Sequence, residues 1–277
     1  MRPIALLVNP PAYDFSAYDF WLKPLGLMWV AGYLRKEGWE IRFLDALDRY
    51  QGGGIVPGRP DGRGEYHKTE VGKPKVYKHI PRRYKRYGMP KDKWEQAIAS
   101  CLPVDRVYIT TLFTYWYPGV LETIDIIKKY QPGVEILVGG ILPKVCKGFV
   151  VSADWGVEFT DWGLSFEQMM EVLPAYDVYP ESDFSPVMTS VGCVYACDYC
   201  LTPVVSTGWR PFSEEYLVDV FSFIQSLGVR RLVFYDDAIL IGAEHHFLPL
   251  MDELCRMGTW EVYFPNGLHP MYITKDV

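Results

Sequence analysis

The sequence lacks any apolar run of the roughly 18 residues that a membrane-spanning helix needs. Its first residues, MRPIALLVNPP, hold only a short apolar stretch, and Pro10 and Pro11 end it before a secretory signal with a cleavage site can form. These absences favour a buried strand over Ile4–Val8, and we expect neither a secretory signal nor a membrane-spanning helix. We therefore expect a cytoplasmic protein with no membrane partner.

Cysteine is scarce, but its distribution is uneven. Only six cysteines occur in 277 residues, and three of them lie within eight residues of one another. Without an export signal the expected compartment is reducing, and there a tight cysteine cluster indicates a metal site rather than a disulfide framework. The six are Cys101, Cys146, Cys193, Cys197, Cys200 and Cys255.

The first part of the chain alternates predicted strands and helices. This alternation predicts an α/β domain over residues 1–173, a flavodoxin-like (Rossmann-type) doubly wound parallel sheet with helices on both faces. The predicted strands are Ile4–Asn9, Glu40–Asp45, Arg106–Thr111, Glu135–Gly140 and a short Trp155–Phe159. The predicted helices are Pro24–Glu37, Pro118–Tyr130 and Ser165–Val172.

Residues 48–92 interrupt this alternation with a basic insertion. From Arg59 to Lys93 there are twelve Lys/Arg and four Asp/Glu, a local charge of +8 that leaves −14 for the rest of a chain whose total is −6. Tyrosines interleave with these cations, a mix that suits RNA phosphates and bases, an anionic cofactor, or packing against the acidic remainder. A solvated or self-packing insertion is the simpler interpretation, and nucleic acid is the less favoured partner. The tyrosines are Tyr66, Tyr77, Tyr84 and Tyr87.

A second strand–helix series follows a predicted linker over Pro174–Asp183. Three units cannot close a barrel, and the chain stops at Val277 as another helix opens, so we expect residues 184–277 to be the first part of a truncated barrel. A native mass near 31.9 kDa would contradict this expectation of a fragment. The predicted strands are Phe184–Ser190, Arg231–Tyr235 and Glu261–Phe264, and the helices are Glu214–Leu227, capped by Ser213, and Ala243–Met257, with Pro249 inside it.

The residues that carry chemistry follow the first strand of this second series. Cys193, Cys197 and Cys200 have the spacing C-x3-C-x2-C, and a loop there lies at the carboxyl end of the strand, where α/β proteins bind ligands. Soft thiolates select zinc or iron–sulfur clusters. Three thiolates on a four-iron cluster leave one iron open for a substrate. A zinc site would need a fourth ligand, supplied by His245, His246 or Cys255.

With Tyr199 before the last cysteine, this motif resembles that of the radical S-adenosylmethionine (SAM) superfamily. The resemblance implies a partial (β/α)6 barrel and a 4Fe–4S cluster held by Cys193, Cys197 and Cys200. It implies reductive cleavage of SAM to a 5′-deoxyadenosyl radical, with the cofactors supplying the chemistry and the protein positioning them. A reductant protein such as flavodoxin or ferredoxin is the implied partner.

The resemblance also implies residues that contact SAM. Asp236 and Asp237 follow the second strand, where the family binds the SAM ammonium, although the usual Gly-Gly-Glu is absent. Asn266, after the third strand, and Tyr199, beside the adenine, are further cofactor-binding candidates. The simpler alternatives are an acidic turn, an Asn-Gly turn and loop packing. Arg210 is more simply a surface charge than a carboxylate partner.

The first domain resembles the cobalamin (B12)-binding domain that precedes many radical SAM barrels. That family shows D-x-H-x-x-G, then S-x-L, then G-G. Gly139 and Gly140 match the last element, and Thr110, with Thr111-Leu112, approximates the second. The first element fails, because Leu47 and Tyr50 stand at its histidine and glycine positions after Asp45, and His67 and His79 lie elsewhere. The resemblance thus implies either cobalamin without a protein histidine ligand or a fold kept for scaffolding.

Three functions follow from these patterns. The first is a radical SAM enzyme whose reaction is cobalamin-dependent methylation, methylthiolation, cyclisation or another rearrangement of an unidentified substrate. The second is a zinc- or cluster-stabilised binding module, RNA-directed through the basic insertion. The third is an inactive fragment that binds its cluster but turns nothing over.

Overall fold

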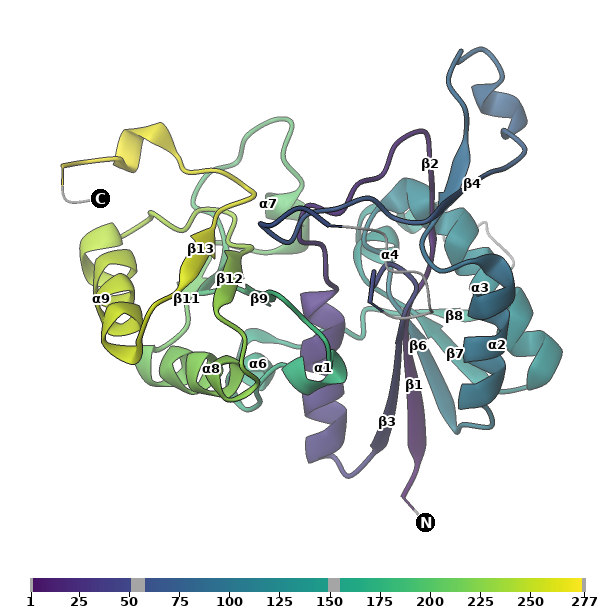
Figure 1. The fold of residues 1–277 in the computed structure, drawn as a ribbon, viewed down its shortest axis with the longest axis horizontal. Helices are drawn as coiled ribbons and strands as arrows, with labels where there is room; N and C mark the ends of the chain where they lie inside the picture. The colour runs from purple at the N-terminus through teal and green to yellow at the C-terminus, as the bar shows by residue number, and fades with distance from the viewer. Residues whose placement is uncertain (1, 51–57, 149–154, 276–277) are drawn as a thin grey trace. The chain divides into compact units, whose positions relative to one another are not determined.

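The computed structural model describes residues 2–50, 58–148 and 155–275. The chain divides into two compact units, unit 1 (Met1–Leu164) and unit 2 (Ser165–Val277), which are described separately (Figure 1). The structure therefore groups residues 165–173, predicted to end the first domain, with the second unit.

Unit 1 is an α/β unit with an added antiparallel sheet. Its strands are β1 (Ile4–Asn9), β2 (Ala12–Asp14), β3 (Glu40–Asp45), β4 (Lys68–Glu70), β5 (Lys85–Tyr87), β6 (Arg106–Ile109), β7 (Glu135–Val138) and β8 (Glu158–Phe159). Its helices are α1 (Leu25–Lys36), α2 (Lys91–Cys101), α3 (Tyr117–Tyr130) and α4 (Ile141–Val145), with short 3-10 turns η1 (Lys75–Tyr77) and η2 (Thr114–Trp116).

The main sheet of unit 1 has the strand order β3-β1-β6-β7-β8, and every neighbouring pair is parallel. This confirms the predicted α/β class with a parallel sheet. Helix α1 lies on one side of the sheet, and α2 and α3 lie on the other (Figure 1). Because all five strands run the same way, the residues that follow them gather at one edge of the sheet.

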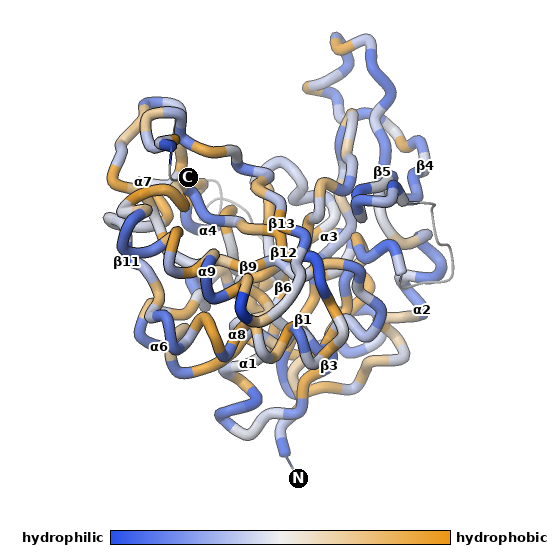
Figure 2. The backbone as a smooth tube through the Cα atoms, turned by 60° about the vertical axis from the view of Figure 1, so that its left-hand side comes forward, coloured by the Kyte–Doolittle hydropathy of each residue, from blue (hydrophilic) through white to orange (hydrophobic). Residues whose placement is uncertain are grey.

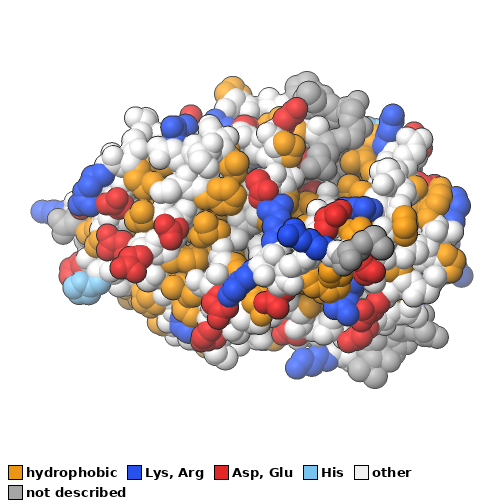
Figure 3. Space-filling view, turned by 90° about the horizontal axis from the view of Figure 1, so that it is seen from below, with side chains coloured by type: hydrophobic (Ala, Val, Ile, Leu, Met, Phe, Trp, Pro, Cys, Tyr) orange, Lys and Arg blue, Asp and Glu red, His pale blue; other side chains and the backbone are white. Residues whose placement is uncertain are grey.

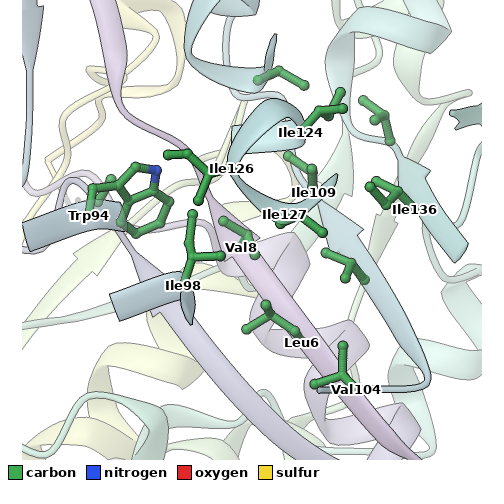
Figure 4. Packing of buried hydrophobic residues seen from close by; sticks show 14 of the residues in the cluster. Leu6, Val8, Trp94, Ile98, Val104, Ile109, Ile124, Ile126, Ile127 and Ile136 are labelled. Atoms are coloured by element: carbon green, nitrogen blue, oxygen red, sulfur yellow. The ribbon is translucent and has the colours of Figure 1, made fainter. Parts of the chain in front are cut away.

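Alternate residues of the strands form the core beneath α2 and α3. A strand places successive side chains on opposite faces, so Leu6 and Val8 of β1 share one face, and both are fully buried. Figure 4 shows them beside side chains of the two helices and of β6, namely Trp94, Ile98, Ile109, Ile124 and Ile127. Figure 2 shows the same apolar character along β1 and β6.

Much of the basic insertion is folded. Strands β2, β5 and β4 form an antiparallel sheet, and Tyr66 and Tyr87 of the insertion pack on Leu47 in a buried cluster. The projecting arm that carries β4 and η1 is drawn mostly in hydrophilic colours in Figure 2. The sequence analysis also missed α2, which begins at the end of the insertion, because its single buried stripe, Trp94 and Ile98, lies in a strongly charged sequence.

Unit 2 is a smaller α/β unit. Its strands are β9 (Ser185–Val187), β10 (Ser190–Gly192), β11 (Trp209–Pro211), β12 (Arg231–Phe234) and β13 (Glu261–Tyr263). Its helices are α6 (Phe166–Met170), α7 (Thr202–Val205), α8 (Glu214–Ser226) and α9 (Phe247–Met257), with 3-10 turns η3 (Tyr176–Val178), η4 (Ala243–His245) and η5 (Pro270–Tyr272). The main sheet has the parallel order β13-β12-β9, and β10 and β11 form a separate antiparallel pair.

Three details of unit 2 correct the sequence predictions. The predicted strand Phe184–Ser190 breaks after Val187, and its end joins β10 of the separate hairpin. Helix α9 begins at Phe247, so Pro249 lies in its first turn, where no backbone donor is needed, and not in the interior. The predicted linker is packed, because Tyr176 is buried and its hydroxyl donates to the Pro186 carbonyl at 3.0 Å.

Within the residues that the structure describes, no helix is long and apolar enough to cross a membrane. On the face shown in Figure 3, acidic and basic side chains are interspersed with apolar ones.

Candidate functional site

The cysteines lie in a loop, residues 193–200, which we call the cysteine loop. It leaves the hairpin of β10 and β11 directly after Gly192, which pairs with Trp209. Gly192 has φ +86°, and a Cβ on it would lie 2.0 Å from the Gly208 carbonyl oxygen. Only glycine permits this close crossing of the two strands beside Cys193.

The three thiols are free and accessible to different degrees. Cys197 is exposed, and Cys193 and Cys200 are half-buried. Two sulfurs face backbone donors, because the Tyr195 amide lies 3.4 Å from the Cys193 sulfur and the Thr202 amide lies 3.4 Å from that of Cys200. Hydrogen bonds to sulfur are among the factors that set the properties of iron–sulfur clusters.

The donor set fits an iron–sulfur cluster in its chemistry. Three soft thiols in one loop, with backbone amides directed at two of them, are the ligands such a cluster takes. Among residues 2–50, 58–148 and 155–275, no three His, Cys, Asp or Glu side chains are gathered closely enough to hold a metal ion. Of the candidate fourth zinc ligands, His246 contacts the Thr189 hydroxyl at 2.9 Å, and His245 and Cys255 are exposed to solvent.

The middle of the cysteine loop contacts the segment after β13. The Tyr195 hydroxyl lies 2.7 Å from that of Tyr272, and its ring stacks on His269 with centroids 5.2 Å apart. The hydrogen bond with Tyr272 raises the pKa of Tyr195. Tyr199, the predicted adenine contact, is 91% exposed, and the neighbouring Cys197 raises its pKa.

Asp236 and Asp237 differ in environment although they are adjacent. Asp236 is buried, and burial raises the pKa of its carboxyl to about 6 against the opposing hydrogen bonds from Thr189 and Ser190. Asp237 is exposed to solvent. Partial desolvation of its carboxyl raises its pKa, and a hydrogen bond from Thr202 opposes this rise. Since Thr202 also contacts Cys200, Asp237 lies close to the far end of the cysteine loop.

The remaining candidates in unit 2 have mainly structural contacts. The Asn266 amide donates to the carbonyl oxygens of Tyr235 at 3.0 Å and Asp236 at 3.2 Å. Arg210 lies 3.5 Å from the Glu167 carboxylate and over the Phe166 ring, as expected of a surface charge.

The candidate cobalamin residues of unit 1 lie beyond the ends of β6 and β7. The Thr111 hydroxyl donates to the Gly139 carbonyl at 2.6 Å and accepts from the Leu142 amide at 2.9 Å, and Thr110 is buried. Gly140 has φ +87° and no room for a Cβ beside Thr111. These contacts bring the two motifs together beyond the ends of β6 and β7.

The Trp162 indole, also in unit 1, lies against the backbone of Gly139, and we call this position the Gly139 cradle. A Cβ on Gly139 would lie 2.2 Å from indole atoms of Trp162, so this glycine lets the indole sit against the backbone. The indole also meets Tyr108 edge-on, and its buried N–H has no hydrogen-bond partner in the described part of the chain. As arranged here, the residues do not fit cobalamin at this cradle, because Trp162 fills it. Leu47, at the histidine position, is buried and supplies no metal ligand.

The aromatic residues of the basic insertion are not free for stacking. Tyr84 is buried, and Tyr77 and Tyr84 pack on one another and on Phe15 with centroids 5.2–6.2 Å apart. Four arginines of the insertion form ion pairs: Arg49 with Asp19, Arg63 with Asp61, Arg83 with Glu70 and Arg86 with Glu122. These contacts favour the self-packing interpretation over base stacking.

Sequence reasoning missed Thr189, Tyr272 and Trp162, and it named His246 only as a candidate zinc ligand. The only local signal was the Thr189-Ser190 pair, whose hydroxyls often bond nearby polar groups, directly before the cysteine motif. The other three lie far along the chain from the residues they contact, so no spacing could identify them.

No family model and no curated protein matches the sequence. Among solved structures, the fold resembles the radical S-adenosylmethionine methyltransferase TsrM from Kitasatospora setae with cobalamin and a 4Fe–4S cluster bound, with a TM-score of 0.59 and 15% identity over 93% of this chain and 53% of that one. The same enzyme with tryptophan substrate and the SAM analogue aza-SAM gives 0.55 and 14% over 92% and 51%. The likeness is one of fold, and this chain spans about half the length of TsrM.

Proposed function

We propose that the chain is a radical SAM enzyme, or the part of one that carries its cluster and SAM site. The observation that carries the proposal is the cysteine loop, with its C-x3-C-x2-C spacing, beyond the first strand of the parallel sheet of unit 2. The fold-level likeness to a radical SAM methyltransferase supports it.

In this proposal Cys193, Cys197 and Cys200 hold a 4Fe–4S cluster. When bound, such a cluster offers an open iron to SAM and supplies the electron for its reductive cleavage. The loop's own residues orient and shield this site: Tyr195 is tied to Tyr272, and amides are directed at two sulfurs.

Of the two aspartates, Asp237 is the better contact for the SAM ammonium. Its carboxylate is exposed next to Thr202 and the end of the cysteine loop, whereas both oxygens of Asp236 accept hydrogen bonds within the protein. A carboxylate beside an ammonium forms a strong charge-assisted hydrogen bond. The Asn266 amide donates to the Asp236 carbonyl and so holds the backbone next to Asp237. Tyr199 is exposed beside the cysteines, where its ring could contact the adenine of SAM.

We propose that unit 1 is a flavodoxin-like domain of the cobalamin-binding type, and that unit 2 is the first part of a partial (β/α)6 barrel. The strand order β3-β1-β6-β7-β8 corresponds to the 2-1-3-4-5 order of flavodoxin-like sheets, and β9, β12 and β13 neighbour one another in chain order. Cobalamin at the Gly139 cradle requires Trp162 to move, so no reaction step is assigned to it.

The reaction class is methylation or a related modification of an unidentified substrate, by analogy with the methyltransferase. A flavodoxin- or ferredoxin-like protein is the proposed electron donor, and a reducing compartment, the cytoplasm, suits six free cysteines.

The test is anaerobic. The full chain is reconstituted with iron and sulfide and reduced with dithionite, and its EPR spectrum is recorded with and without SAM. A cluster signal that SAM changes, together with 5′-deoxyadenosine formation, supports the proposal. Stable zinc binding in place of iron would refute it.

A further inference from the structure

We propose that the Asp236 carboxylate is a positioning group that fixes the start of the cysteine loop through Thr189 and Ser190. The inference rests on the proposed function, because its importance depends on the loop being the cluster site. It assigns Asp236 a role other than direct contact with SAM.

The contacts of Asp236 converge on two consecutive residues. The Thr189 amide lies 3.0 Å from both carboxylate oxygens, and the Thr189 hydroxyl lies 2.8 Å from Oδ1. The Ser190 amide and hydroxyl lie 2.7 and 2.8 Å from the same oxygen. One carboxylate therefore accepts from four donors in the short segment between β9 and the cysteines.

Thr189 also connects Asp236 to the hairpin of β10 and β11, from which the cysteine loop leaves. Because its hydroxyl donates to Asp236, it accepts from the His246 Nε2–H at 2.9 Å. His246 packs edge-on against Trp209 with centroids 5.6 Å apart, and Trp209 pairs with Gly192, the residue before Cys193. A continuous set of contacts thus joins Asp236 to the first cluster ligand.

The backbone that carries Asp236 is itself held on both sides. The Tyr235 amide donates to the Val187 carbonyl at 2.7 Å, extending the pairing of β12 with β9. Asn266 donates to the carbonyls of Tyr235 and Asp236 from beyond β13. The carboxylate is therefore fixed relative to all three strands of the unit 2 sheet.

The chemistry of the site requires a carboxylate. All four donors are N–H or O–H groups, and an ionised carboxylate offers only acceptors. An asparagine has the same shape, but its NH2 group at the Oδ2 position would face the Thr189 amide, which is itself a donor. Its neutral amide oxygen at the Oδ1 position would accept from the four donors more weakly than a carboxylate does. Asp236→Asn should therefore loosen the Thr189-Ser190 segment while leaving the packing volume unchanged.

The first test uses the chain without a cluster. Rates of alkylation by iodoacetamide are measured for each cysteine by mass spectrometry in the wild type, in Asp236→Asn and in the control Asp252→Asn. The control makes the same change at an exposed site on α9. We expect alkylation of Cys193 to rise about five-fold or more in Asp236→Asn, by the loss of at least one net hydrogen bond, and to stay unchanged in the control. Cys101, in unit 1, is the internal reference.

A second pair of variants guards against misfolding of Asp236→Asn. Thr189→Val removes the buried hydroxyl at nearly constant volume, and Thr189→Ser keeps it. Thr189→Val should raise the Cys193 rate as Asp236→Asn does, and Thr189→Ser should restore the wild-type rate. Equal rates for Val and Ser, or a wild-type rate in folded Asp236→Asn, would overturn the inference.

In the reconstituted protein, cluster content and the EPR signal of the reduced cluster can be compared between variants that are equally well folded. With circular dichroism unchanged, Asp236→Asn should bind less than half the wild-type iron and sulfide, or give a reduced-cluster EPR signal with shifted g-values. Wild-type loading with an unshifted signal would contradict the positioning role. If the wild type binds no iron, the proposed function fails, and the alkylation rates still decide the inference.

Discussion

The buried ion pair of Arg86 and Glu122 gives a quantitative prediction about the basic insertion. The side chains are 4% and 6% exposed, and three guanidinium–carboxylate contacts of 2.7–3.1 Å join β5 to α3. The Tyr13 hydroxyl also donates to Glu122, and burial followed by this hydrogen bond raises the pKa of Tyr13. Arg86 further donates to the Met89 carbonyl, so the pair connects four segments of unit 1.

Removing one partner of such a pair leaves a buried charge without compensation, which costs about 3–5 kcal/mol. We expect this cost in the free energy of unfolding for Glu122→Leu and for Arg86→Met alone. The double variant Arg86→Met/Glu122→Leu buries no charge and should lie closer to the wild type than either single variant. Its remaining cost is that of the Tyr13 hydroxyl without an acceptor, about 1–3 kcal/mol.

The assay is urea unfolding followed by circular dichroism for the four proteins, combined as a double-mutant cycle. Single variants that cost less than about 1 kcal/mol, or a double variant as unstable as the sum of the singles, would refute the reasoning. Such a result would mean that the ion pair does not anchor the insertion to α3, and it would favour a solvated insertion over a self-packing one.

The other predictions concern the two candidate sites. Cys197→Ala should abolish the cluster, because two thiolates do not hold it, and full iron and sulfide after the change would refute the ligand assignment. Burial raises the pKa of Asp236 from 3.8 to about 6, although the hydrogen bonds from Thr189 and Ser190 favour its ionised form, so the folded chain loses stability as the pH rises from 3.8 toward 6 and the carboxyl ionises. The wild type should therefore lose about 2 kcal/mol relative to Asp236→Asn between these pH values in urea unfolding, and a pH-independent difference would contradict this. Gly139→Ala should destabilise the chain in thermal unfolding but cost far less in a Trp162→Ala background, whereas equal costs would exclude the clash. Trp162→Ala should bind hydroxocobalamin more tightly in an absorbance titration, without a histidine-ligated spectrum because Leu47 offers no imidazole; clear histidine coordination would show that the motif is misaligned.

Much of the fold followed from local patterns. Apolar runs between turn residues located the strands of both parallel sheets, and capping signals located helix ends, as at Ser213, which accepts from the Tyr216 amide at 3.3 Å. Prediction failed where long-range contacts determined the structure. The charged sequence of α2 forms a helix whose Trp94 and Ile98 pack into the core of unit 1, and the strand before the cysteines breaks where Thr189 and Ser190 bond Asp236.

The sequence by itself determined the donor set: three thiols at a spacing that one loop can present, directly after a buried strand. That conclusion needs only covalent proximity. Tertiary structure alone decided the roles of Asp236 and Asp237, which are chemically identical neighbours. Successive residues at the end of a strand face opposite directions, so one carboxylate is buried against Thr189 and the other is exposed beside Thr202. In the same way only packing placed Trp162 against Gly139, because the free energy of burying an indole depends on a surface assembled from distant parts of the chain.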